Sequence, residues 1–166
     1  MKKIVLAAAM TSAVIAVPAA AAPGDTANTS GVANAEIVAP IAIVHDTGAA
    51  LDFGIMTAGG GGTVVVLTDG SGTATGEVVL VSGRANTADS FTVTGDANRS
   101  FDIVTTGGSV SNGTGGTMNF STDADATGTL DTTGETTFSV GGTLTVGASQ
   151  AAGSYTGSYT ATVTYN

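Results

Sequence analysis

Short runs in which apolar and polar side chains alternate recur along the chain, and most are followed by Gly, Asn, Asp or Ser. In the run FTVTG, Phe91 and Val93 alternate with threonines, and in FDIV the residues Phe101 and Ile103 share one face. A period of two residues is typical of β-strands. One apolar face and one threonine face suit a sheet that packs on a second sheet. The pattern therefore predicts an all-β, immunoglobulin-like antiparallel β-sandwich of roughly eight to ten short strands.

Glycine pairs and one Asp-Gly pair separate these runs and predict turns between strands. Asp69 and Gly70 accept the positive φ of a tight turn. The same turn role is expected for three glycine pairs, Gly107-Gly108, Gly115-Gly116 and Gly141-Gly142. The stretch 106–117 is expected to be a mobile loop. No segment indicates a second domain, so residues 22–166 are predicted to form a single domain.

The first residues have the composition of a secretory signal peptide. Two lysines at positions 2 and 3 precede an apolar run over 4–17 and small residues over 19–22. Cleavage is expected after Ala20 or Ala21, because a cut after Ala22 would leave Pro23 first. The apolar run is shorter than the ~20 residues that span a bilayer. We therefore expect residues 1–21 to be removed and the mature chain to be exported to the periplasm, the cell surface or the medium, with no integral membrane segment.

Charge and composition exclude several classes of partner and chemistry. The chain has a formal charge of −9, which becomes about −11 when the two lysines of the leader are lost, since the mature chain keeps only Arg84 and Arg99 as cations. A nucleic-acid-binding protein needs a basic surface to contact phosphates, so nucleic acid is not an expected partner. The chain has no cysteine, and its mature part has no lysine. Disulfides and lysine-based covalent links are therefore excluded.

His45 is the only histidine and stands beside Asp46. A catalytic triad also needs an activated nucleophile, and no nucleophile-elbow motif occurs in the sequence. Zinc sites use several nitrogen or sulfur ligands, which one histidine cannot supply. We therefore expect no enzyme activity, no catalytic residues and no cofactor, with His45 at a strand end or on the surface.

A short acidic stretch is the best candidate for a hard-cation site. Asp123 and Asp125 form a D-x-D pair, and Asp131 follows nearby. Calcium binds carboxylate and carbonyl oxygens in loops of this kind, but the EF-hand pattern is absent. A solvated acidic loop is the favoured interpretation, and calcium binding is the alternative.

The end of the chain carries the most regular alternation. Counted back from Asn166, Tyr165 is second, Val163 fourth, Ala161 sixth, Tyr159 eighth and Gly153 fourteenth. This spacing resembles the C-terminal signature of chaperone-usher pilins, whose last strand is bound by a periplasmic chaperone. The alternative is an ordinary C-terminal strand of a complete sandwich.

Longer motifs give a second resemblance that covers nearly the whole mature chain. Residues 35–54, 91–98 and 138–166 are similar to a secreted bacterial family known as domain of unknown function 4402. The motifs LDFG and QAAGSYTGSYTATVTY are also similar, more distantly, to spore coat protein U and archaic chaperone-usher pilins. The resemblance implies a pilin-like sandwich, with a periplasmic chaperone and an usher as partners and with self-assembly into fibres.

In such pilins, the N-terminal extension of one subunit completes the sandwich of the next by β-strand addition. Here Ala33, Ala35 and Ile37 lie on one alternating face of residues 31–38, and Pro40 interrupts the ladder before the run 41–44. Residues 31–38 are therefore a candidate donor segment. In the competing interpretation, residues 31–44 are the protein's own first strand and the sandwich is complete.

These observations lead to two functional expectations. The first is a non-enzymatic secreted structural or adhesive protein, a pilin-like subunit of a bacterial surface fibre or coat assembled by β-strand addition. The alternative is a monomeric secreted β-sandwich that binds a glycan or calcium through the loops at 106–117 and 121–131.

Overall fold

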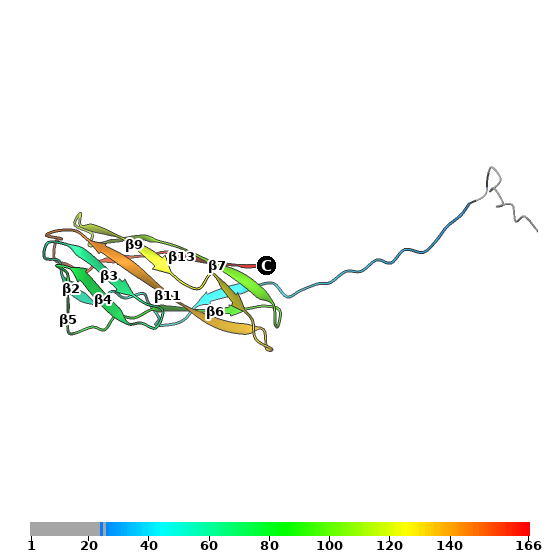
Figure 1. Cartoon of the computed structure of the whole chain (residues 1–166), viewed down its shortest axis with the longest axis horizontal. Coiled ribbons are helices and arrows are strands. Elements are labelled where there is room, and N and C mark those ends of the chain that lie inside the picture. The colour runs from blue at the N-terminus through cyan, green and yellow to red at the C-terminus, as the bar shows by residue number, and fades with distance from the viewer. Residues whose placement is uncertain (1–23, 25) are drawn as a thin grey trace, which may run out of the picture. The chain divides into compact units, whose positions relative to one another are not determined.

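The structure is a computed structural model that describes Gly24 and residues 26–166. The predicted signal peptide, residues 1–21, lies outside the described residues. Residues 37–166 form one compact unit, shown in Figure 1. Residues 26–36 belong to a separate unit and form no strand or helix, and their side chains are exposed.

The described part of the chain contains thirteen strands and no helix. This confirms the all-β class, although the strands are more numerous than expected. Their bounds are β1 Ala42–His45, β2 Ile55–Thr57, β3 Gly62–Val66, β4 Gly72–Gly76, β5 Val79–Val81, β6 Asp89–Thr94, β7 Ser100–Thr106, β8 Gly108–Ser111, β9 Thr117–Asp123, β10 Thr127–Thr129, β11 Glu135–Val146, β12 Thr156–Gly157 and β13 Thr160–Tyr165.

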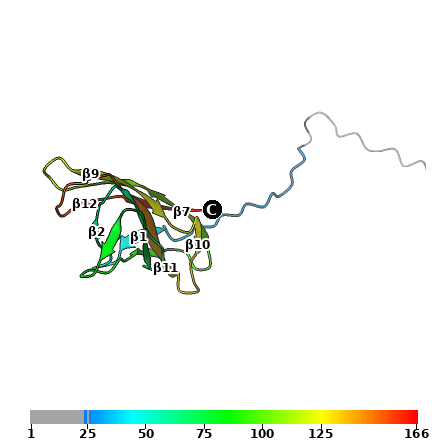
Figure 2. The same ribbon diagram turned by 60° about the vertical axis from the view of Figure 1, so that its left-hand side comes forward.

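All strand pairs are antiparallel, and the strands of unit 37–166 form a curled sandwich (Figures 1 and 2). The main sheet has the order β1-β6-β11-β9-β8-β12, with β3 and β4 joined to it through β11. A second sheet has the order β10-β7-β13, and β2 pairs with β5 in a third. The last strand, β13, is therefore an edge strand.

The long strand β11 organises the main sheet. Its first half pairs with β6, and its second half pairs with β9 and with β3. Gly141 and Gly142 lie in the middle of this strand and are buried, so the turn predicted there is wrong. A Cβ on Gly141 would lie 2.3 Å from the carbonyl oxygen of Val66, and a Cβ on Gly142 would lie 2.4 Å from that of Ser121. These glycines let neighbouring backbones approach β11 instead of reversing the chain.

Half of the expected loop at 106–117 is strand as well. β7 ends at Thr106 in one sheet, and β8 begins at Gly108 in the other, so Gly107 is the point where the chain changes sheets. Gly115 and Gly116 do lie in the turn between β8 and β9, as predicted. The Asp69-Gly70 turn between β3 and β4 is also confirmed, with φ of 82° at Gly70.

Alternation places the apolar side chains in two buried clusters. One contains Phe53, Val64, Val66, Val78, Met118, Phe120, Leu144 and Val146. The other contains Val93, Phe101, Ile103, Leu130, Phe138 and Val140. Tyr159 packs against both clusters. The end of the chain thus joins the two parts of the core.

Candidate functional site

The residues of the closing motif lie at the junction of the two sheets. Ala161, Val163 and Tyr165 face the second core cluster from β13, but each is only half-buried. Thr160, Thr162 and Thr164 alternate with them on the outer face. The predicted alternation of the last strand is therefore present.

All three tyrosines of the chain lie in the last residues, and each hydroxyl is hydrogen-bonded. Tyr165 donates to the carbonyl of Ala39 at 3.0 Å and accepts from the backbone N–H of Asp96 at 2.7 Å. The Tyr155 hydroxyl donates to the carbonyl of Ala151 at 2.7 Å. These bonds fix the closing segment to itself and to the opposite sheet.

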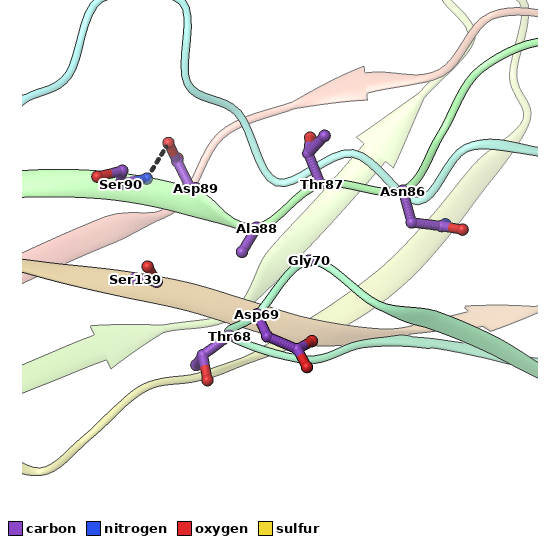
Figure 3. Close-up of a pocket in the computed structure, with 9 residues that line it drawn as sticks. All are labelled: Thr68, Asp69, Gly70, Asn86, Thr87, Ala88, Asp89, Ser90 and Ser139. Atoms are coloured by element: carbon purple, nitrogen blue, oxygen red, sulfur yellow. Dashed lines mark hydrogen bonds between the residues drawn. The ribbon is translucent and has the colours of Figure 1, made fainter.

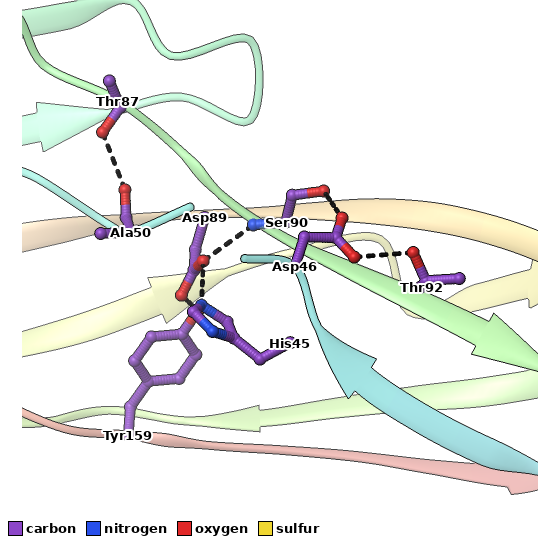
Figure 4. Close-up of polar contacts among 8 residues, drawn as sticks. All are labelled: His45, Asp46, Ala50, Thr87, Asp89, Ser90, Thr92 and Tyr159. Carbon is purple, nitrogen blue, oxygen red and sulfur yellow. Dashed lines mark hydrogen bonds and ion pairs between the residues drawn. The ribbon is translucent and has the colours of Figure 1, made fainter. Parts of the chain in front are cut away.

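Tyr159 forms the third of these contacts, in a polar group at the wall of the core (Figure 4). Its hydroxyl donates to Oδ2 of Asp89 at 2.7 Å, while Nε2 of His45 donates to Oδ1 of the same carboxylate at 2.7 Å. Asp89 is only 4% exposed, whereas the His45 side chain is 49% exposed. Burial, together with the hydrogen bond to Asp89, raises the pKa of Tyr159 well above its usual value. Tyr159 therefore stays a hydrogen-bond donor in this group.

A groove of about 1140 Å³ runs beside this group. One wall is residues 49–58, and the other is residues 150–159. Its apolar lining comes mainly from the first core cluster, which contributes Phe53, Met118, Phe120, Leu144 and Val146. Phe91, which is outside that cluster, also lines the groove. The groove is large enough for several side chains of another segment.

In the described residues, hydrogen bonds cross the groove only beside its two ends. At one end the backbone N–H of Ser149 donates to the carbonyl of Gly59 at 3.1 Å, and at the other the Tyr159–Asp89–His45 group links the two sheets. Between these ends, within the described residues, no hydrogen bond connects 49–58 to 150–158. The walls are thus held apart with an apolar floor between them.

The backbone of the C-terminal wall has unpaired groups that point away from its neighbour. The N–H of Asn112 donates to the carbonyl of Gly116 on the β9 side. Backbone groups of successive strand residues point to opposite sides, so the preceding residue, Ser111, directs its N–H and C=O groups towards β12. Ser111 pairs with Thr156, and the backbone of the following residue, Gly157, therefore faces away from β8. Gly157 lines the groove, which makes this wall a free strand edge.

The same argument applies to β13. The N–H of Asn166 donates to the carbonyl of Ser100 on β7, so Thr164 and Thr162 also face β7. Val163 and Ala161 direct their N–H and C=O groups to the open edge. A free edge of this kind can pair with another chain.

A second, smaller pocket of about 350 Å³ is polar (Figure 3). Its labelled side chains do not converge on one point: the ends of the Asp69 and Asn86 side chains lie apart, and the Asp89 carboxylate is turned towards the Ser90 backbone (Figure 3). Asp69 already accepts from the N–H and the hydroxyl of Ser71. This pocket offers no set of groups for binding or catalysis.

The candidate calcium ligands do not form a cluster. Asp123 ends β9, Asp125 follows it, and Asp131 accepts hydrogen bonds within its own turn from Thr133 and Glu135. Among the residues that the structure describes, no group of three or more acidic or histidine side chains could hold a metal ion. The loops proposed for glycan or calcium binding contain the short strands β8 and β10.

Three aspartates with lowered pKa values predict a loss of stability in acid. Hydrogen bonds lower the pKa of Asp46, Asp69 and Asp131 below the usual 3.8. The largest contribution comes from the Ser90 hydroxyl for Asp46, from the Ser71 hydroxyl for Asp69 and from the backbone N–H of Glu135 for Asp131. A lowered folded-state pKa stabilises the protein above the unfolded value, and this contribution is lost as pH falls through the folded value. Thermal melts followed by circular dichroism should therefore show a midpoint that falls between about pH 4 and pH 2.

Asp131→Asn should make this fall shallower. Asp125→Asn is the matched control, because in the described part of the chain its carboxylate accepts no hydrogen bond. Identical pH profiles for the wild type and Asp131→Asn would contradict the prediction.

The structure brings together only part of the predicted interaction set. Gly153 and Tyr159 line the groove, while Ala161, Val163 and Tyr165 continue beyond its end. Ala33 and Ala35 lie in the strandless unit 26–36, and Ile37 is 98% exposed. The buried carboxylate of Asp89 and the aromatic floor had no signal in the local sequence.

A family model described as Domain of unknown function (DUF4402) matches residues 42–165. No curated protein and no solved structure matches the chain. In the described residues, no helix has the length and apolar character needed to cross a membrane.

Proposed function

The chain belongs to the family described as Domain of unknown function (DUF4402), and we propose that it is a non-enzymatic, exported structural or adhesive subunit that accepts a β-strand into its groove. In this proposal the protein is a pilin-like subunit of a bacterial surface fibre or coat, and a periplasmic chaperone and an usher are its partners during assembly. The carrying observation is the open groove between residues 49–58 and 150–159.

The chemistry of the groove supports a strand as its occupant. β-strand addition combines backbone hydrogen bonds along a free edge with side chains that enter pockets on alternate positions. Gly157 supplies backbone groups at the wall, and Phe53 and Phe120 supply an apolar floor. An inserted strand would cover the floor of the groove and pair with the free edge at the same time.

The absence of a paired nucleophile supports a non-enzymatic role. The His45 ring has one hydrogen-bond partner in the described part of the chain, the carboxylate of Asp89. A hydrolytic triad needs a hydroxyl or thiol on the other side of the histidine ring. Tyr159 instead donates a hydrogen bond to Asp89, and burial together with that bond raises its pKa, which disfavours ionisation to a phenolate nucleophile.

We assign the donor strand to residues 26–38 of a second copy. In residues 26–36 there is no strand or helix, and the side chains are exposed. Ile37, which follows, is 98% exposed. Apolar side chains on a segment without secondary structure gain burial when they enter an apolar groove.

Electrophoresis of the mature chain tests this proposal. Unheated samples in SDS should run as a ladder of multimers that collapses to monomer on boiling, and deletion of residues 26–38 should leave only monomer. A variant with the same residues of 26–38 in scrambled order is the matched control for length and composition, and it should also fail to form a ladder. A ladder that survives the deletion would exclude the donor role, and a wild type without multimers would contradict the proposal.

A further inference from the structure

Asp89 is a buried carboxylate at the end of an otherwise largely apolar groove. Its side chain is 6% exposed and accepts from Tyr159, His45 and the N–H of Ser90. The other acidic side chain that lines the groove, Asp52, is paired with Arg84 at 2.9 Å. Asp89 is therefore the acidic group that an inserted strand meets without an arginine beside it.

A second carboxylate brought against Asp89 would be strongly unfavourable. Covering the groove removes water, and like charges repel more strongly where the dielectric is low. An uncharged side chain avoids this cost. The groove should thus discriminate between strands by the charge of the face that points inwards.

The two faces of residues 26–38 differ in this property. The odd-numbered face carries no charge and consists of Ala27, Thr29, Gly31, Ala33, Ala35 and Ile37. The even-numbered face carries Glu36. Because side chains alternate along a strand, only one of these faces can point to the floor.

We propose that Asp89 is a specificity-determining residue: it excludes carboxylates from the inserted strand and so selects the odd-numbered face of residues 26–38 as the inward one. This inference rests on the proposed function, since it concerns the same groove. It fixes the alternate register of the donor, with Ala33, Ala35 and Ile37 inwards and Glu36 outwards.

Paired substitutions on adjacent residues of the full mature chain test the inference. Ala33→Glu and Ala35→Glu place a carboxylate on the inward face, whereas Asn34→Glu places the same charge on the outward face. The inward variants should reduce the multimer fraction at least about tenfold, and Asn34→Glu should change it less than about twofold. Ala33→Gln and Ala35→Gln control for size and should lose less than the glutamates do.

A second arm identifies Asp89 as the source of the selectivity. In an Asp89→Asn background, the multimer fraction of at least one inward glutamate variant should be about fivefold or more higher than the fraction the same glutamate gives with Asp89 present. Thermal melts check that Asp89→Asn folds; if it does not, the Glu and Gln variants at each inward position decide alone whether charge is discriminated.

The outcomes separate this inference from the proposed function. A wild type without multimers overturns both. If the wild type forms a normal ladder but inward and outward glutamates, or Glu and Gln at one inward position, lower the multimer fraction equally, only the role of Asp89 is overturned. The same holds if Asp89→Asn folds and the loss of multimers caused by the inward glutamates is unchanged in that background.

Discussion

Phe101→Ala is expected to lower the free energy of unfolding by about 3 to 5 kcal/mol, because a large core side chain is removed and a cavity remains. Phe101 is 0% exposed and belongs to the second core cluster. Its ring lies against Gly128 of β10, where a Cβ would come within 2.5 Å of the ring. The backbone on that side is held by the β10–β7 pairing, which limits how far the site can collapse.

Urea unfolding followed by circular dichroism measures this loss. Val104→Ala is the control on the same strand, because Val104 is 59% exposed and should cost less than about 1 kcal/mol. A loss for Phe101→Ala no larger than that for Val104→Ala would show that the β10-β7-β13 sheet does not cover the core as described.

Gly141→Ala should be the second strongly destabilising change, at about 1 to 3 kcal/mol. The added Cβ would meet the carbonyl oxygen of Val66 at 2.3 Å and the carbonyl carbon of Leu67 at 2.9 Å. Both contacts are with backbone, so no side chain can rotate away. The clash can be relieved only if β11 and the C-terminal end of β3 move apart.

The matched control is Gly147→Ala, just after β11. There the new Cβ would meet only the side-chain Oε1 of Gln150, at 3.3 Å, and the free energy of unfolding should change by less than about 0.5 kcal/mol. Thermal or urea unfolding compares the two variants. Equal stability of Gly141→Ala and the wild type would favour the turn that the sequence pattern indicates at this pair of glycines.

The pair Gly141-Gly142 shows where local sequence patterns fail. Two adjacent glycines are a turn signal, yet here they lie inside a strand because the backbones of Val66 and Ser121 come close to it. Nothing within a few residues reveals that approach. By contrast, the alternation around Phe91 and Phe101 depends only on which side faces the core, and it predicts β6 and β7 correctly.

The candidate site was harder to predict than the fold. Asp89 meets His45 across 44 positions of sequence and Tyr159 across 70 positions. Such contacts follow from strand order, which alternation does not encode. The motif at the C-terminus did identify Gly153 and Tyr159 as residues of one segment, and both line the groove.

The late position of β11 has a consequence for the time course of folding. Its partners β3, β6 and β9 all precede it, so most of the main sheet stays unjoined until residues 135–146 have left the ribosome. Sheets built from distant segments fold slowly, and their unpaired strands are exposed to aggregation meanwhile. The core of such a chain is complete only when nearly all of the chain is available, and its earlier strands stay unprotected against aggregation until then.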